Sequence, residues 1–154
     1  MAIFELELPD EVIKEFKEIY DNADEIFGEM TKAGAQSVLT VVETRAPKTL
    51  QGHFRISKVY TTPTDGGINT KVYCTGYIPF SDPTRKYFSR YAKGRMYNTK
   101  LGVPAEFLAI MYEYGRHGAP FPKQPFFRSA FSKNLIEQVM LQTQKKVTHG
   151  ILDD

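Results

Sequence analysis

Residues 112–131 read YEYGRHGAPFPKQPFFRSAF, and this stretch is the most informative part of the chain. It combines a glycine-punctuated turn, the prolines Pro120, Pro122 and Pro125, and an aromatic helix start. Because proline fixes φ, such a loop loses little entropy when it is ordered against another surface. The stretch contains no nucleophile–base pair, ligand cluster or phosphate-binding loop. It therefore predicts a rigid corner that makes contacts rather than a reaction centre.

Helical periodicity is strong near both ends of the chain. Apolar residues recur at intervals of three and four along residues 10–45, after a proline that is tolerated at a helix start. An unbroken helix there would be about 54 Å long, so we expect its surplus length to contact a neighbouring molecule. Gly28 and Gly34 each cost roughly 1 kcal/mol relative to Ala, so a kink or a break is expected near them. A second apolar stripe predicts a C-terminal helix from Pro125 to Lys146.

Between these helices, the sequence predicts a β-hairpin. Two β-like runs, residues 53–62 and 68–76, flank the turn sequence PTDGG at residues 63–67. A short helical run is expected from Val103 through Met111, and periodicity leaves open whether residues 112–114 continue it or form a strand. The predicted fold is a single α+β domain spanning residues 1–154, with a long N-terminal helix and a C-terminal helix packed on a small antiparallel sheet.

Composition bounds the class of protein. The chain has 154 residues, of which 42% are hydrophobic and 25% are charged, which is typical of one globular domain. Cys74 is the only cysteine, so an intramolecular disulfide is excluded. No apolar run approaches the ~20 residues that a membrane span needs, and the first residues do not resemble a signal peptide. We expect a soluble protein that is not exported and has no membrane partner.

The net charge of +2 conceals a marked asymmetry along the sequence. Residues 1–30 contain ten acids and two bases, a net charge of −8. Residues 31–154 contain eight acids and eighteen bases, a net charge of +10. In a ring of identical copies, such a split offers complementary head-to-tail faces.

Residues 77–102 form an unusual segment, which we interpret as an insertion in the domain. Its tyrosines alternate with bases, and the candidate electrostatic contact arm consists of Arg85, Lys86, Arg90, Lys93 and Arg95. Cations on phosphates and rings on bases are a common way to hold single-stranded nucleic acid, so residues 85–100 support this alternative function. The same bases could instead contact the acidic first helix of an adjacent copy.

The sequence contains only weak candidates for catalytic or metal-binding residues. No two of His53, His117 and His149 have metal-ligand spacing, and none of them has a cysteine or carboxylate three or four residues further on that would make a metal-binding motif. Glu106 and Glu113 are seven residues apart and could share a helix face, but exposed helix carboxylates are far commoner than acid–base pairs. The sequence predicts no catalytic residue, no metal site, no cofactor and no enzyme.

The motif of residues 112–131 also carries a family resemblance. Glu-Tyr-Gly at residues 113–115, a short loop, and Pro-Phe-Phe-Arg-Ser-Ala at residues 125–130 resemble the hallmark of the gene-ten-like minor tail component family of tailed phages and prophages. Members of that family are assigned to tail completion, tail termination or head–tail joining. Its parts correspond here to Pro9–Arg45, to His53–Gly76 with the Tyr112 region, and to Pro125–Lys146. The family's Pro-x-x-Thr-Gly element appears only as PKTLQG at residues 47–52, with two extra residues before the glycine.

The resemblance implies a non-enzymatic structural subunit of a virion, acting at the head–tail neck or the tail end. It implies a ring of copies, commonly hexameric, that caps the tail tube and docks to the head connector or head-closure protein. It places the protein in the host cytoplasm during assembly and then in the virion, with nucleic acid not a primary partner. The candidate interface comprises large and cationic side chains of the corner, with one of the two adjacent phenylalanine rings inward and one outward: Tyr114, Arg116, Phe121, Phe126, Phe127 and Arg128.

Overall fold

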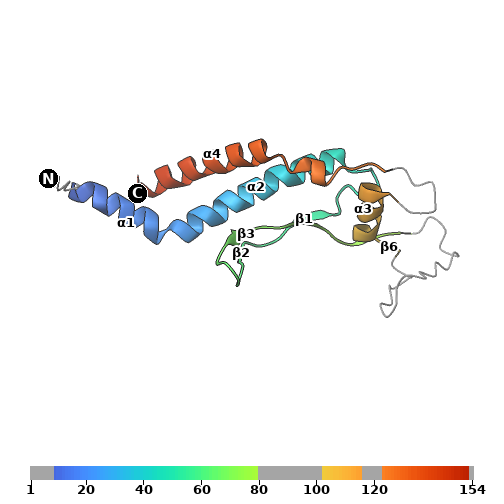
Figure 1. Cartoon of the computed structure of the whole chain (residues 1–154), viewed down its shortest axis with the longest axis horizontal. Helices are drawn as coiled ribbons and strands as arrows, with labels where there is room; N and C mark the ends of the chain where they lie inside the picture. The colour runs from blue at the N-terminus through green and yellow to red at the C-terminus, as the bar shows by residue number, and fades with distance from the viewer. Residues whose placement is uncertain (1–8, 80–101, 116–122, 153–154) are drawn as a thin grey trace, which may run out of the picture.

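The computed structural model describes residues 9–79, 102–115 and 123–152. The described elements, in chain order, are α1 (Asp10–Asp21), α2 (Ala23–Arg45), β1 (Phe54–Ile56), β2 (Tyr60–Thr61), β3 (Ile68–Asn69), β4 (Val72–Cys74), β5 (Tyr77–Ile78), β6 (Val103–Pro104), α3 (Ala105–Tyr114), the 3-10 turn η1 (Arg128–Ala130) and α4 (Lys133–Leu152). The predicted α+β fold is confirmed. Figure 1 shows an elongated molecule in which α2 and α4 lie side by side in opposite directions along its length.

The long N-terminal helix is divided, but not at either glycine. The break falls at Asn22, whose φ of −101° and ψ of 10° lie outside the helical region. Its backbone N–H and its side-chain amide both donate to the carbonyl of Glu18, which satisfies the end of α1. α2 is continuous through Gly28 and Gly34. At Gly34 an added Cβ would lie 3.3 Å from Met140 Cγ, so the missing side chain lets α4 approach closely.

The predicted hairpin is confirmed, and its inner face contacts α2. β1 pairs antiparallel with β4 in the register Phe54↔Cys74 and Ile56↔Val72, and β2 pairs with β3 around the turn. Because side chains alternate between the faces of a strand, the next ladder pair, Arg55 and Tyr73, points away from α2 and is exposed.

The core lies where the end of α2, the hairpin and the start of α3 meet. It is formed by the buried side chains of Val38, Val42, Ala46, Leu50, Phe54, Ala105, Phe126 and Ala130. Phe54 and Leu50 are 1% and 0% exposed, and burying a side chain of this size stabilises the fold by about 1.5–3 kcal/mol. Leu50 lies in the turn of residues 47–52, so this turn supplies a core side chain.

Residues 112–114 are helical, because α3 continues to Tyr114. The assignment of the Tyr112 region to the sheet, which the resemblance implied, is therefore wrong. The predicted start of the last helix at Pro125 is also wrong. Residues 123–127 are extended or bent, η1 follows, and α4 begins at Lys133 and continues to Leu152. Phe131, with a φ of −82° and a ψ of 71°, lies outside the helical region and separates η1 from α4.

Strands β5 and β6 pair antiparallel, with Tyr77 opposite Pro104 and Ile78 opposite Val103. Residues 80–101, which contain most of the predicted insertion and the whole contact arm, lie between these strands and outside the described residues. The interpretation of residues 77–102 as an insertion stays a prediction.

Candidate functional site

The centre of the corner is the carboxylate of Glu113, on the last turn of α3. Its Oε2 accepts hydrogen bonds from the backbone N–H groups of Phe126, at 2.9 Å, and of Phe127, at 3.0 Å. Its Oε1 accepts from the backbone N–H of Arg128 at 3.3 Å and from Arg128 Nε at 3.4 Å. Glu113 thus binds the donors at the start of η1 and joins the two halves of the sequence motif. Three converging N–H groups form an anion-binding nest, which is filled here by the protein's own side chain.

Glu113 is only 4% exposed, so our interpretation of it as an ordinary exposed carboxylate is wrong. Glu106, seven residues earlier on α3, is exposed. Burial alone raises the pKa of Glu113, but the hydrogen bonds from Phe127, Phe126 and Arg128 outweigh it, and the pKa lies below its ordinary value. A carboxylate held ionised by donors of its own chain has no proton to give and no free lone pair for a substrate. Its role is structural.

Two further contacts join the end of α3 to residues 124–128. The carbonyl of Tyr112 accepts a hydrogen bond from the backbone N–H of Gln124 at 2.8 Å. The guanidinium of Arg128 lies over the ring of Tyr114, 5.0 Å from its centre, in a cation–π contact. Gly115 ends α3 with a φ of +80°, a conformation that glycine adopts without strain. In Glu-Tyr-Gly, Glu113 therefore binds the backbone of residues 126–128, Tyr114 supplies the aromatic ring and Gly115 ends the helix.

The two adjacent phenylalanines have different environments, as the sequence predicted. Phe126 is 3% exposed and packs edge-on against Phe54, with ring centres 5.7 Å apart. It belongs to the core of the protomer, so it offers no surface to a partner and is removed from the candidate interface. Phe127 is half-buried and contacts Phe54 and Phe131, the latter with ring centres 5.4 Å apart. It connects the core to the surface.

Of the other candidate interface residues, two are accessible and two are not described. The side chain of Arg128 is 67% exposed, and Tyr114 is 57% exposed. Arg116 and Phe121 lie outside the described residues, as do Arg85, Lys86, Arg90, Lys93 and Arg95 of the contact arm. The structure therefore brings Tyr114, Phe127 and Arg128 together around Glu113. Sequence reasoning had not included Glu113 in the candidate site.

An open apolar groove adjoins this corner, between α3 and strand β4. We call it the α3 groove; its volume is about 470 Å³, its apolar lining includes Tyr73, Cys74, Ile110, Tyr114 and Phe127, and Glu106, Glu113 and Arg128 also line it. Sequence reasoning missed the groove because its walls come from four separated segments, at residues 54, 73–74, 106–114 and 127–128. One signal was present in the sequence: Phe107, Ile110 and Tyr114 recur at intervals of three and four, and all three are exposed.

Cys74 is the only thiol in this groove, and it is half-buried. Burial, and next the charge of Glu106, raise its pKa to about 11. The protonated thiol is a poor nucleophile, so Cys74 acts as a small apolar side chain in the wall. In the described ranges, no group of three or more histidine, cysteine, aspartate or glutamate residues could hold a metal ion. No helix among the described residues has both the length and the apolar character needed to cross a membrane.

In comparisons with protein-family models, curated proteins and solved structures, this chain matches none of them. The likeness to a phage tail family therefore depends on residues 112–131 and on the order of the elements. The function that this likeness implies for the chain is a proposal.

Proposed function

We propose that this chain is a non-enzymatic structural subunit of a tailed-phage or prophage virion. In this proposal, copies of the chain form a ring at the head–tail neck or the tail end, in contact with the tail tube protein and the head connector or head-closure protein. Assembly takes place in the host cytoplasm, and the ring then remains in the virion. Two features support the proposal: the resemblance of residues 112–131, and a surface suited to contacts with other protein chains.

The observation that carries the proposal is the grouping of exposed apolar side chains. Among the described residues, twelve large apolar or aromatic side chains are between 40% and 80% exposed. Scattered exposed apolar residues are normal on a monomer, but grouped ones mark contact surfaces. Here six of the twelve form stripes on two helices. Ile13, Phe16 and Tyr20 lie on α1. Phe107, Ile110 and Tyr114 lie on α3, and the last two line the groove.

The hydrogen bonds between Glu113 and residues 126–128 also support the proposal. A subunit that binds neighbours needs a surface whose shape is fixed before contact, because ordering a loop on binding costs free energy. Glu113 fixes the backbone of residues 126–128, and Arg128 is in turn held over Tyr114. Residues 126–128 and Tyr114 are thus held in place by contacts within a single copy, as a preformed contact surface requires.

The test is the mass of the purified protein in solution. We expect native mass spectrometry and light scattering to find one defined oligomer of the 17.6 kDa chain at micromolar concentration. We also expect disruption of the gene in its phage or prophage to leave heads and tails unjoined or tails of abnormal length. A protein that stays monomeric and binds oligonucleotides with an affinity that falls steeply with salt would contradict the proposal. That result would favour the alternative of single-strand binding through residues 85–100.

A further inference from the structure

Helix α1 makes little buried contact with the rest of the molecule. No residue of α1 is buried, and Ile13, Phe16 and Tyr20 are 51%, 63% and 80% exposed. The half-buried apolar side chains of Val12 and Ile19 lie on the adjacent side of the helix, where α1 meets α4 and α2. An element that buries so little apolar surface separates from its neighbours at a low cost in free energy.

Ion pairs do not fix α1 in its position. The ion pair of α1 is internal, between Lys14 and Glu18 at 3.8 Å. Lys145 and Lys146 lie on α4, the helix against which α1 packs, but among the described residues neither of them forms an ion pair with an acid of α1. The position of α1 on α4 therefore depends mainly on a few half-buried side chains.

The joint at Asn22 interrupts the helical hydrogen bonds only locally. The backbone N–H of Asn22 donates to the carbonyl of Glu18 at 3.2 Å, and the N–H of Ile26 donates to the carbonyl of Asn22 at 3.0 Å. Both bonds have the i→i−4 spacing of an α-helix. Among the described residues, the bonds that a continuous helix would make from the N–H groups of Ala23 and Glu25 are missing. A change at Asn22, from a ψ of 10° to the helical value of about −42°, would allow them to form.

The sequence keeps one helical register through the joint. Phe16, Tyr20, Ala23 and Phe27 are spaced by four, three and four residues, as on one face of a single helix. Straightened at the joint, residues 10–45 would form one rod about 54 Å long, with this stripe along one side. The break is therefore not imposed by the apolar pattern of the sequence.

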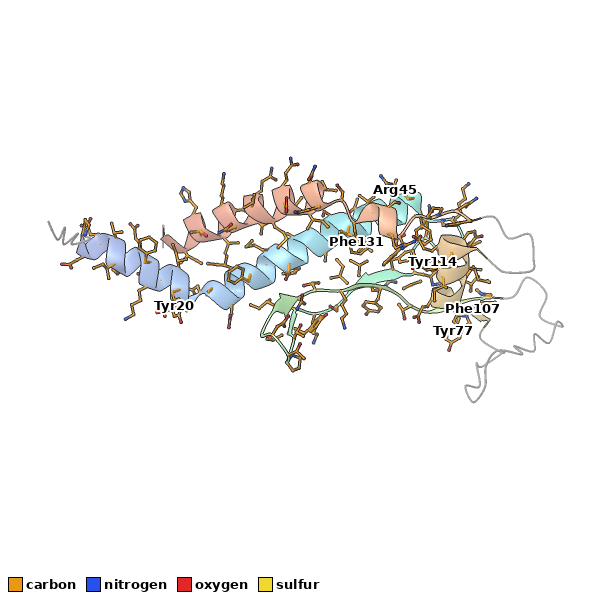
Figure 2. The ribbon with its side chains drawn as sticks, in the orientation of Figure 1. Tyr20, Arg45, Tyr77, Phe107, Tyr114 and Phe131 are labelled. Carbon is orange, nitrogen blue, oxygen red and sulfur yellow. The ribbon has the colours of Figure 1, made fainter. Side chains whose placement is uncertain are left out.

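We propose that α1 is a hinged helix with two positions, one docked on α4 and one in line with α2, and that Asn22 is the hinge. Figure 1 shows the docked position, in which α1 leaves the line of α2 toward the C-terminal end of α4, and Figure 2 shows Tyr20 at the joint. The docked position gains the contacts of Val12 and Ile19. It also gains the bond from the side-chain amide of Asn22 to the carbonyl of Glu18, at 2.8 Å. The in-line position gains the missing backbone bonds, so opposing contributions of similar size separate the two positions.

The hinge determines how much apolar surface α1 presents. In the docked position the exposed stripe consists of Ile13, Phe16 and Tyr20. In the in-line position Val12 and Ile19 leave α4, so the exposed apolar face becomes wider. This inference goes beyond the proposed function and does not depend on it, because the motion takes place within one copy.

The test measures the distance between α1 and α4 inside one molecule. Spin labels at Lys17→Cys and Gln142→Cys, which are exposed positions on the two helices, report this distance by pulsed electron–electron double resonance. The background is Cys74→Ala, which removes the native thiol. Labelled protein is diluted into an excess of unlabelled protein, so that only distances within one copy are recorded. We expect a shorter distance for the docked position, which dominates, and a longer one for the in-line position.

Two substitutions at the hinge separate straightening from the loss of a hydrogen bond. Asn22→Ala and Asn22→Gly both remove the side-chain bond to Glu18, but alanine favours a helix and glycine disfavours it. The ratio of in-line to docked molecules should therefore be about fivefold higher in Asn22→Ala than in Asn22→Gly. Equal ratios in these two variants would overturn the assignment of Asn22 as the hinge.

A matched pair of substitutions tests the contact with α4. Ile19 is half-buried where α1 docks, whereas Ile13 is 51% exposed on the stripe. Both changes to alanine alter helix propensity equally, so their difference reports the contact. Ile19→Ala should raise the in-line population about fivefold relative to Ile13→Ala. Equal effects would mean that packing on α4 does not hold α1.

A second measurement needs no labels and no change at Cys74. In Asn22→Ala the amide hydrogens of Ala23 and Glu25 should exchange with water more slowly than in Asn22→Gly, because the in-line position bonds them. Unchanged exchange, or one unchanged distance in every labelled variant, would overturn the inference and leave the proposed function standing. A monomeric wild type that shows both distances would contradict the proposed function and support the hinge.

Discussion

At the scale of single residues, Glu113 determines how the corner is built. Three backbone N–H groups and one guanidinium N–H converge on its two oxygens. In Glu113→Gln the side chain keeps one acceptor oxygen and introduces an NH₂ group that faces donors. We expect the free energy of unfolding at pH 7 to fall by about 1–3 kcal/mol, the usual cost of leaving buried groups unsatisfied. Urea unfolding followed by circular dichroism measures this loss.

The sign of the pH dependence follows from the lowered pKa. In the unfolded chain the carboxyl of Glu113 titrates near its ordinary value of 4.5, and in the fold it titrates at a lower pH. Its stabilising contribution is therefore complete above about pH 4.5 and is lost as the pH falls through the folded value. The difference between wild type and Glu113→Gln should shrink over that window. Glu106→Gln, on the same helix but exposed, should change stability little at any pH, and a loss as large as that of Glu113→Gln would contradict this account.

At the scale of elements, the pairing of β5 with β6 depends on a glycine. Gly102 has a φ of +109°, and an added Cβ would collide with the carbonyl oxygen of Ile78. Gly102→Ala must therefore both adopt a strained conformation and displace strand β5. Since strained non-glycine conformations cost about 1–3 kcal/mol each, we expect a loss of stability at the upper end of that range or beyond it.

Gly52→Ala is the control that separates strain from collision. Gly52 has a φ of +81°, but an added Cβ would have no neighbour within 4 Å. Its loss in thermal or urea unfolding should thus reflect the conformation alone and be smaller than that of Gly102→Ala. Equal losses would indicate that the approach of Gly102 to Ile78 is not a constraint on the fold.

The elements also show which parts of the fold could be predicted from the sequence. Period-two alternation and the turn at residues 63–67 sufficed for the hairpin, because both signals are local. The break between α1 and α2 was expected near Gly28 or Gly34 on propensity grounds, yet it falls at Asn22. Propensity is overridden here because the packing of α4 accommodates Gly34 within a continuous helix.

The candidate site was only partly predictable, for a related reason. The motif indicated the segment that contains Phe126, Phe127 and Arg128, and it led us to expect one phenylalanine ring inward and one outward, without deciding which. The contact between Glu113 and residues 126–128 spans at least thirteen residues and leaves no periodic trace in the sequence. The last helix begins only at Lys133 because Phe131, with a ψ of 71°, leaves the helical region and separates η1 from α4.

At the scale of the whole molecule, separation of charge is the dominant feature. The acidic first part and the basic remainder of the described residues carry −6 and +6. If copies associate end to end, raising the salt from about 0.1 M to 1 M shortens the screening length from about 10 Å to about 3 Å and should weaken association. Light scattering across a salt series measures this. Affinity that stays constant or rises with salt would mean that apolar contact alone holds the copies together.

The bend at Asn22 has a geometric consequence for such an assembly. Figure 1 shows α1 leaving the line of α2 at an angle. In the ring that we propose, a neighbour that contacts α1 would lie in a direction that this bend helps to set. The bend would therefore contribute to the curvature of the ring, together with the contacts between the subunits.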